Sequence, residues 1–314
     1  MKQIAIIGAG NWGTALAVIA ARAGHNVNLW ARNPARINLP VAVTGDLHEA
    51  LRDASMVLFA APSHTARELL TAMSPLLNEA AIIVSVSKGI EIETGKRISE
   101  IAKEVAGTAH PFVCLSGPSF AKEVVAGYPT AIVAASKDAA AARAVQNDLS
   151  FENLRIYTNS DVVGTEIGGS VKNVMAIAAG MTTGLGFGSN SVAALITRGL
   201  AEITRLARRE GAQMETLMGL AGLGDLVLTC TGSLSRNRFV GEELGKGKTL
   251  AEITAGMTEV AEGINTARAV KQLADRAGLE MPITNEVNAV LYDGKPAREA
   301  VAELMSRPLR EEIH

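Results

Sequence analysis

Short apolar segments alternate with helix-like segments through the first half of the chain, and this alternation limits the fold more than any other feature. The apolar runs are continuous and rich in β-branched residues, which is typical of parallel strands covered on both faces. They lie at Gln3–Ile7, Asn26–Ala31, Ser55–Ala60, Ala81–Val86 and Pro111–Leu115. The alternation predicts a doubly wound, Rossmann-type α/β domain with a parallel sheet, which we expect Thr130–Ala135 and Leu154–Tyr157 to extend.

The pattern changes after Asn159. Helical spacing dominates Asp161–Thr183, Ser189–Glu210 and Ala261–Ala277, and strand-like runs become rare. A chain of 314 residues is long enough for about two domains. We therefore predict a sheet domain over residues 1–159 and a mostly α-helical domain over residues 160–314. No Pro- or Ser-rich linker separates them, so we expect the two domains to pack closely.

Composition excludes several classes of protein. The 30 Lys and Arg residues are balanced by 32 Asp and Glu residues, and aromatic residues make up 4%, so we expect no nucleic-acid partner. Cys114 and Cys230 lie far apart, which suits a reducing compartment and gives no metal-ligand spacing. No apolar run approaches the ~18–20 residues of a membrane helix. Ile4–Ile7 is also too short for a signal-peptide core, so we expect a cytoplasmic protein without an integral membrane segment.

The sequence GAGNWG over residues 8–13 is a G-x-G-x-x-G motif between a predicted strand and a predicted helix, Trp12–Ala23. Gly8 allows the tight turn, Gly10 lets the backbone approach a diphosphate, and Gly13 lets the helix pack closely on the strand. The free N–H groups at the start of the helix then bind the diphosphate. In this strand–helix context the motif predicts binding of a dinucleotide, NAD or NADP.

The second predicted strand ends with Trp30-Ala31-Arg32-Asn33 and contains no acidic residue. NAD-specific sites usually place an Asp or Glu about 20 residues after the glycine motif to bind the ribose 2′-hydroxyl. Arg32 can instead pair with the 2′-phosphate of NADP. An arginine exposed to solvent without any role in binding fits this position equally well, so the sequence leaves both interpretations of Arg32 open. The first interpretation favours NADP, or the use of both cofactors.

Lys172 is the single charged residue between Ile167 and Thr197. Desolvation at such a position lowers the pKa of a lysine toward neutral pH, which general acid–base catalysis by lysine requires. The alternative is a lysine whose ammonium group extends to solvent. Glycines at positions 168, 169, 180, 184, 186 and 188 surround Lys172, and they mark either a crowded site or close packing of helices.

Three further polar features are candidates for the same site. Ser235-Arg236-Asn237 offers a hydroxyl, a guanidinium group and an amide, which suits a phosphate dianion. Ser235 is also a good N-cap, and both roles are compatible because helix N-termini bind anions. Asp225 follows glycines in what we interpret as a turn, where it either points a carboxylate into the site or caps the turn. Asn173 can hydrogen-bond the substrate or the nicotinamide amide.

Eight short motifs follow one another along the chain: residues 8–13 (GAGNWG), 87–89 (SKG), 116–121 (SGPSFA), 169–174 (GSVKNV), 222–226 (GLGDL), 229–231 (TCT), 235–237 (SRN) and 260–263 (VAEG). Each motif is common alone, whereas the ordered set is specific and covers the chain to about residue 300. This ordered set resembles that of the NAD(P)-dependent glycerol-3-phosphate dehydrogenase family. The segment Asn33–Thr44, before Asp46, is shorter than the family usually has, so we expect a helix or loop near the adenosine end to be missing.

The resemblance implies an oxidoreductase that interconverts sn-glycerol 3-phosphate and dihydroxyacetone phosphate with NAD or NADP and supplies glycerol 3-phosphate for glycerophospholipid synthesis. Residues 1–159 then bind the dinucleotide, and residues 160–314 carry catalysis and substrate binding. Family members are often dimers, so we expect a homodimer. The implied catalytic residues, with no metal, are Lys172, Lys88, Asp225 and Asn173. The implied contacts to the small phosphorylated three-carbon substrate are Lys88, Gly117, Ser119, Lys172, Asp225, Ser235, Arg236 and Asn237. The implied cofactor contacts are Gly8, Gly10, Asn11, Trp12, Gly13, Arg32, Lys88, Gly117, Ala121, Arg236, Val260 and Glu262.

Two rival functions are consistent with parts of the pattern. A 3-hydroxy acid dehydrogenase of the same two-domain group would also use a Lys and an Asn in mid-helix, but it would not need the phosphate-binding cluster at residues 235–237. A redox sensor that binds the dinucleotide without catalysis would be expected to carry a basic recognition helix for DNA, and the sequence contains none.

Overall fold

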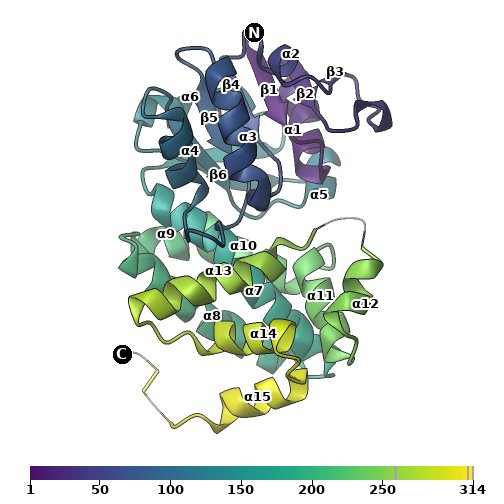
Figure 1. Cartoon of the computed structure of the whole chain (residues 1–314), viewed down its shortest axis with the longest axis vertical. Coiled ribbons are helices and arrows are strands. Elements are labelled where there is room, and N and C mark those ends of the chain that lie inside the picture. Colours follow the sequence, from purple (N-terminus) through teal and green to yellow (C-terminus); the bar gives the residue numbers. More distant parts are fainter. Residues whose placement is uncertain (258–259, 310, 313–314) are drawn as a thin grey trace.

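The computed structural model describes residues 1–257, 260–309 and 311–312. In this part of the chain, eight strands form one sheet with the order β3-β2-β1-β4-β5-β6-β7-β8, at the top of Figure 1. The sheet and the helical part that follows it confirm the predicted fold class. The strands are β1 Gln3–Ile7, β2 Asn26–Trp30, β3 Ala42–Thr44, β4 Met56–Phe59, β5 Ile82–Ser85, β6 Phe112–Ser116, β7 Thr130–Ala135 and β8 Leu154–Asn159.

Two features of the sheet differ from the sequence prediction. Strand β3 was missed because it has only three residues, lies at the sheet edge and is not buried, so it carries no apolar run. Strand β7 is antiparallel to β6, with Ser116 opposite Val133, and β8 is parallel to β7. The connection from β6 to β7 contains only the short helix α5 (Ala121–Val125) and does not cross the sheet, so the chain returns in the opposite direction.

Helices cover both faces of the sheet, which explains the continuous apolar strands. Side chains of α1 and α6 share one core with alternate residues of the strands, such as Ile4 and Ile6. Side chains of α2, α3 and α4 share a second core with the other strand face, including Ile7 and Phe59. The helices are α1 Asn11–Arg22, α2 Leu47–Leu51, α3 Ala66–Met73, α4 Ile98–Ala106 and α6 Ala139–Leu149.

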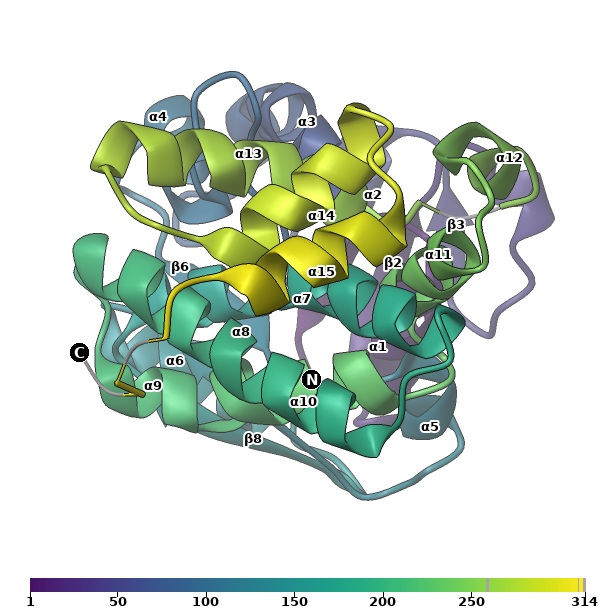
Figure 2. The ribbon, with the colours of Figure 1, turned by 90° about the horizontal axis from the view of Figure 1, so that it is seen from below.

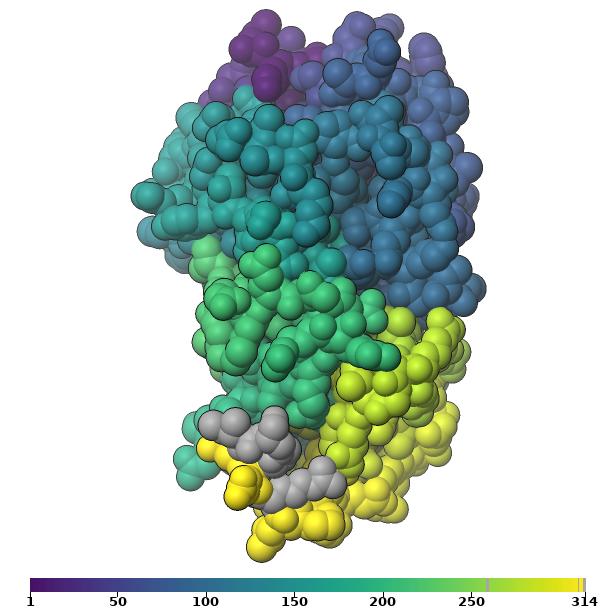
Figure 3. Space-filling model, turned by 90° about the vertical axis from the view of Figure 1, so that its left-hand side faces the viewer, coloured from purple at the N-terminus to yellow at the C-terminus, as the bar shows by residue number. Residues whose placement is uncertain are grey.

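The second part of the chain is helical among the described residues and lies below the sheet in Figure 1. The space-filling view shows the two parts in contact across the middle of the molecule (Figure 3). The boundary between residues 159 and 160 stays a prediction. The helices are α7 Val162–Gly184, α8 Ser189–Arg209, α9 Met214–Met218, α10 Asp225–Thr231, α11 Arg236–Gly245, α12 Leu250–Ala255, α13 Glu262–Ala277, α14 Pro282–Tyr292 and α15 Ala297–Ser306.

Helix α7 connects the sheet to the helical part. Its first turns pack on the sheet, where Val162 shares a small core with Cys114 and Val133. Its second half lies at the centre of the helical part, among α8, α10, α11 and α13–α15 (Figure 2). A helix of this length spans about 34 Å. Nearly all of it is buried, although it carries two charged residues, Glu166 and Lys172.

Close packing between α7 and α11 explains two glycines of the segment around Lys172. A Cβ atom at Gly180 would lie 2.0 Å from the carbonyl oxygen of Arg238, and one at Gly184 would lie 2.1 Å from that of Glu242. On α11, a Cβ atom at Gly241 would lie 1.9 Å from the carbonyl oxygen of Ile177. These glycines therefore mark close packing of helices, and the packing fixes the start of α11 relative to the centre of α7.

We expect Gly241→Ala to destabilise the protein because the added methyl group meets backbone atoms of α7, which cannot move without separating the helices. The free energy of unfolding in urea should fall by about 1–3 kcal/mol or more. Gly256→Ala is the matched control, because its Cβ atom would contact only the carbonyl oxygen of Ile253 at 3.7 Å. Equal stability of the two variants would contradict the role given to the glycine contact.

Candidate active site

The candidate residues gather where the carboxyl ends of the parallel strands meet. Gly8 follows β1, Arg32 follows β2, Lys88 follows β5 and Gly117 follows β6, so all four residues lie at the carboxyl ends of parallel strands. Below, this side of the sheet is called its carboxyl edge. Strand order reverses between β1 and β4, and ligands of doubly wound sheets bind at such a point. The helical part lies against the same edge, because Lys172 of α7 reaches it.

The glycine motif has the geometry of a diphosphate cradle. Gly8 has a φ of +116°, and a Cβ atom there would lie 2.7 Å from the backbone of Ala60. A Cβ atom at Gly13 would lie 1.9 Å from the carbonyl oxygen of Gly8, so α1 packs on the turn only with glycine there. At Gly10, in contrast, a Cβ atom would have no neighbour within 4 Å. Gly10 is also the N-cap of α1 and places no side chain over the first turn, where the positive end of the helix favours an anion.

Lys172, Asp225 and Lys88 form the centre of the site. The Lys172 ammonium group donates to Oδ1 of Asp225 and to the hydroxyl of Thr229, the latter at 2.8 Å. Lys88 Nζ donates to the other carboxylate oxygen of Asp225 at 2.7 Å and to the carbonyl oxygen of Gly117 at 3.2 Å. One carboxylate thus holds two cations, one from the sheet domain and one from α7.

Burial changes the protonation of Lys172. Its side chain is 7% exposed, so the ammonium group does not extend to solvent, and that alternative is wrong. Desolvation by burial lowers the pKa of Lys172 from 10.5 to about 7, with the neighbouring Lys88 adding to the decrease and Asp225 opposing it. A lysine with this pKa can both donate and accept a proton near neutral pH.

The interpretation of Asp225 as part of a turn is wrong. Residues Leu220–Gly224 form a π-helical segment, and Asp225 begins α10. Gly168 allows this segment to approach α7, because a Cβ atom there would lie 2.8 Å from the carbonyl oxygen of Ala221. Helix geometry and close packing, rather than a loop, therefore place the Asp225 carboxylate beside Lys172.

The segment at residues 235–237 begins α11. Ser235 is its N-cap, with Oγ accepting the N–H of Arg238 at 3.2 Å, so the N-cap expectation is confirmed. The Arg236 side chain is exposed, whereas Asn237 is buried. Asn237 Nδ2 donates to Oδ1 of Asn173 at 3.0 Å, which joins this segment directly to the helix of Lys172.

The start of α13 contacts the sheet domain. Glu262 Oε1 accepts the N–H of Ser63, in the loop after β4, at 2.9 Å. Burial raises the pKa of Glu262, while the hydrogen bond from Ser63 and the nearby Arg236 favour the charged carboxylate. Val260 is 46% exposed. This contact joins the start of α13 to the loop after β4, beside Gly89 in the loop that carries Lys88.

The structure therefore brings most of the predicted residues to one edge of the sheet. Ser119 Oγ donates to the carbonyl oxygen of Gly117 at 3.0 Å, the atom that also accepts from Lys88. Ala121 begins α5, and Asn11 and Trp12 lie in the first turn of α1. Arg32 is exposed beyond β2, far along the sheet from Lys172, and forms no ion pair with any residue that the structure describes.

Sequence reasoning assigned no role to two residues that the site uses, although one of them, Thr229, lies in the matched segment at residues 229–231. Thr229 bonds the Lys172 ammonium group and lies four residues after Asp225, on the same helix face. That spacing could have identified Thr229 if the segment had been recognised as helical. Ser63 binds Glu262 through its backbone N–H, and no side-chain pattern could have indicated it.

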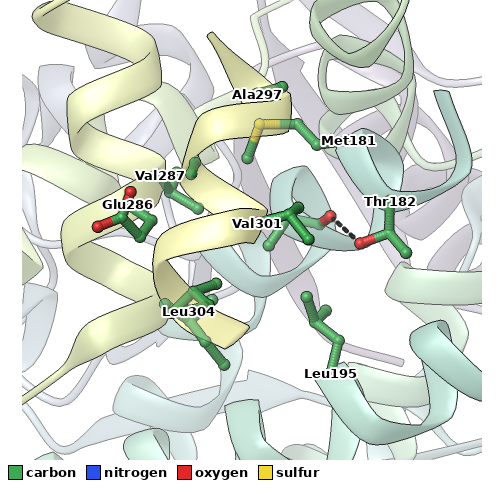
Figure 4. A pocket seen from close by; sticks show the side chains of 11 residues that line it. Met181, Thr182, Leu195, Glu286, Val287, Ala297, Val301 and Leu304 are labelled. Atoms are coloured by element: carbon green, nitrogen blue, oxygen red, sulfur yellow. Dashed lines mark hydrogen bonds between the residues drawn. The ribbon is translucent and has the colours of Figure 1, made fainter. Parts of the chain in front are cut away.

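A small cavity elsewhere in the helical part contains none of these residues. It lies between α7, α8, α14 and α15 and is lined largely by apolar side chains such as Leu195 and Val287 (Figure 4). Its volume of about 20 Å³ accommodates one water molecule. Among the described residues, no helix is long and apolar enough to cross a membrane, and no three or more His, Cys, Asp or Glu side chains are grouped so that they could hold a metal ion.

Comparison with known proteins gives consistent matches over nearly the whole chain. Residues 3–142 match the N-terminal model of NAD-dependent glycerol-3-phosphate dehydrogenase, and residues 161–302 match the C-terminal model. The glycerol-3-phosphate dehydrogenase [NAD(P)+] of Citrifermentans bemidjiense is 50% identical over 331 residues, with 99% of each chain covered. That of Koribacter versatilis is 51% identical over 335 residues, covering 100% of this chain and 99% of the relative.

A solved structure agrees with these matches. Glycerol-3-phosphate dehydrogenase from Coxiella burnetii superposes with a TM-score of 0.93 at 38% identity, covering 98% of this chain and 99% of that one. The alignments with the curated relatives are longer than the 314 residues of this chain, so the relatives contain residues without a counterpart here. The chain belongs to the NAD-dependent glycerol-3-phosphate dehydrogenase family.

Proposed function

We propose that this protein interconverts sn-glycerol 3-phosphate and dihydroxyacetone phosphate with NAD or NADP, as the names of its relatives indicate. The observation that carries the proposal is the desolvated Lys172, held against Asp225 at the sheet edge that bears the dinucleotide motif. The glycine geometry at residues 8–13 fits a dinucleotide diphosphate. The direct test is oxidation of NADH or NADPH on addition of dihydroxyacetone phosphate.

The chemistry requires a hydride, which the nicotinamide supplies when the cofactor is bound, and a proton at the C2 oxygen. Lys172 Nζ donates this proton during reduction and accepts it during oxidation. Asp225 positions Lys172 and Lys88 by accepting from both, and Lys88 contributes positive charge beside the reacting carbonyl. Asn173, next to Lys172, hydrogen-bonds the substrate or the nicotinamide amide.

The substrate phosphate binds at the start of α11. Arg236 offers two parallel N–H donors there, and Ser235 and the backbone of Asn237 lie at the positive end of the helix. The Gly117 carbonyl and the Ser119 hydroxyl lie beside Lys88 and complete the substrate contacts.

The carboxyl ends of the strands, from the glycine motif to Glu262, would hold the cofactor. Asn11, Trp12 and Ala121 would contact it from the sheet domain, and Arg32 would bind at the adenosine ribose. Lys88, Gly117, Arg236, Val260 and Glu262 would contact its nicotinamide half.

We further propose, from the resemblance alone, that residues 1–159 bind the dinucleotide, that residues 160–314 carry the catalytic and substrate residues, and that the protein is a cytoplasmic homodimer. Its product then supplies glycerophospholipid synthesis. Sedimentation of the purified chain tests the homodimer.

The pKa of Lys172 sets the sign of the pH dependence. Reduction needs the protonated lysine as an acid, so kcat/KM for dihydroxyacetone phosphate should fall as the pH rises through about 7. Oxidation needs the neutral lysine as a base, so kcat/KM for glycerol 3-phosphate should rise through the same range. In Lys172→Met we expect turnover to fall by several orders of magnitude while cofactor still binds.

Lys271→Met is the control for this variant, because Lys271 is a half-buried residue of α13 that pairs with Asp275 on its own helix. Its turnover and both pH profiles should match those of the unaltered protein. Near-normal turnover of folded Lys172→Met would remove Lys172 from the mechanism.

Arg236→Lys keeps the charge but removes the two parallel N–H donors of the guanidinium group. We expect KM for dihydroxyacetone phosphate to rise, at a cost of about 1.5–3 kcal/mol in binding. Unphosphorylated dihydroxyacetone should be affected much less. Arg238→Lys is the control, since Arg238 lies on the same helix and pairs with Glu242. Equal losses on both substrates would show that Arg236 does not hold the phosphate.

Arg32 should favour NADPH, because its exposed guanidinium group follows β2, where the adenosine ribose of a dinucleotide lies. We expect the protein to accept NADPH at least as well as NADH, and Arg32→Ala to raise KM for NADPH more than for NADH. Arg52→Ala is the control, because Arg52 is also exposed but lies before β4, near the amino ends of the strands. A strong preference of the unaltered protein for NADH, or equal losses in Arg32→Ala, would exclude this role.

A further inference from the structure

The loop after β5 carries Lys88 and continues into a hairpin at residues 90–97, called the 90–97 hairpin below, which leads to α4. Ile90 and Arg97 pair across the hairpin in an antiparallel bridge. The Ile90 side chain is buried in the apolar core of the helical part, although the loop connects two elements of the sheet domain. The hairpin that follows Lys88 therefore packs on the helical part of the chain.

Glu166 of α7 binds the end of this hairpin. Its Oε2 accepts from Nη1 of Arg97 at 3.2 Å, and its Oε1 accepts the N–H of Ser99, at the start of α4, at 2.8 Å. The side chains of Glu166 and Arg97 are 5% and 12% exposed. Burial raises the pKa of Glu166, whereas Arg97 and Ser99 favour its charged form and the nearby Glu100 opposes it. Glu166 is thus a buried carboxylate that fixes Arg97 on α7.

The same face of α7 also contacts Lys88 itself. Residues three or four positions apart share a helix face, so Glu166, Gly169 and Lys172 follow one another along it. A Cβ atom at Gly169 would lie 3.7 Å from Cγ of Lys88. Nδ2 of Asn173 lies 3.5 Å from the carbonyl oxygen of Lys88. The Lys88 stem therefore passes close to α7 between the place where Glu166 holds the hairpin and the place where Lys172 enters the site.

We propose that Glu166 is a positioning residue for Lys88. By binding Arg97 it holds the 90–97 hairpin on α7, and the hairpin in turn keeps the Lys88 ammonium group beside Lys172. The proposal rests on the proposed function, because it gives Glu166 a role in assembling that site. An ion pair with a purely structural role would contribute to stability alone and would leave the titration of Lys172 unchanged.

Displacement of Lys88 and loss of the Glu166 charge act on Lys172 in opposite directions. Burial, with Lys88 adding to it, lowers the pKa of Lys172, so departure of Lys88 would raise that pKa. A charged Glu166 is negative, so loss of its charge without any movement would lower the pKa of Lys172 or leave it unchanged. The sign of the change therefore separates positioning through Lys88 from a direct electrostatic effect.

Glu166→Gln tests the proposal with almost no change of shape. The amide oxygen can still accept the N–H of Ser99, but the negative charge that binds Arg97 is gone. We expect the pKa of Lys172 to rise above about 7, by about 0.5 pH unit or more. An unchanged or lowered pKa of Lys172 in folded Glu166→Gln would overturn the proposal.

The measurement is ¹³C NMR of the full chain with lysine labelled at Cε, in which the signal of Lys172 is assigned by its loss in Lys172→Met. This titration needs no turnover, so it can fail or succeed independently of the proposed function, which the reduction of dihydroxyacetone phosphate by the unaltered protein tests. If the protein is active, the fall of kcat/KM for dihydroxyacetone phosphate should move to higher pH in Glu166→Gln by the same amount.

A double-mutant cycle shows whether Glu166 acts through Lys88. Lys88→Met alone should raise the pKa of Lys172, because it removes the neighbouring cation. We expect Lys88→Met combined with Glu166→Gln to give the same pKa as Lys88→Met alone, since the residue that Glu166 positions is already absent. A further rise in the double variant would overturn the proposal.

Glu202→Gln is the matched control for loss of a buried carboxylate. Glu202 of α8 is 2% exposed, and its Oε1 accepts the N–H of Ile283 at the start of α14 at 2.6 Å. This variant should lose thermal stability, with the pKa of Lys172 unchanged. An equal rise of that pKa in Glu202→Gln would overturn the proposal, because general loosening of the fold would then explain both results.

If Glu166→Gln does not fold, the combined variant Arg97→Met and Glu166→Met replaces it in the same titration. Apolar residues of similar size often substitute for a buried ion pair without loss of the fold. This variant removes the link between the hairpin and α7 without leaving an unpaired charge. A pKa of Lys172 equal to that of the unaltered protein would overturn the proposal, whereas a rise would support it.

Discussion

The bond between the buried Lys172 and Asp225 places demands on the whole molecule. A lysine can be held in a dry interior only if its helix is covered on all sides and its charge is compensated. Helix α7 meets the first demand by packing on the sheet with its first turns and on surrounding helices with the rest. Asp225 meets the second, and it also holds Lys88 of the sheet domain. The Asp225 carboxylate therefore joins the two parts of the chain, and it opposes the decrease in the pKa of Lys172 that burial causes.

Carboxylates from distant segments hold the surrounding elements in place. Glu166 of α7 accepts the N–H of Ser99 at the start of α4, and Glu202 of α8 accepts the N–H of Ile283 at the start of α14. Helix α14 has no side-chain cap of its own, so Glu202 satisfies N–H groups that would otherwise be unpaired. Glu262 binds the loop after β4 in the same manner. These contacts fix the loops and helices whose relative placement the site requires.

Features that depend on neighbours in the chain could be predicted from the sequence. The strands β1, β2, β4–β8 and the helices α7, α8 and α13 lie where apolar periodicity indicates them, because burial of a strand or helix face leaves a local pattern. Strand β3 and the reversed direction of β7 leave no such pattern. Asp225 was assigned to a turn because glycines usually mark turns, whereas here they allow a π-helical segment to pack against α7.

The sequence by itself determined the Rossmann-type fold, the glycine motif and the identity of the lysine that the site buries. Tertiary structure alone decided that Lys172, Lys88 and Thr229 share the surroundings of Asp225, that Ser63 meets Glu262, and that Glu166 meets Arg97. The physical reason is that periodicity and turn geometry are local, whereas desolvation and hydrogen-bond direction depend on which distant groups the packing brings within about 3 Å of one another.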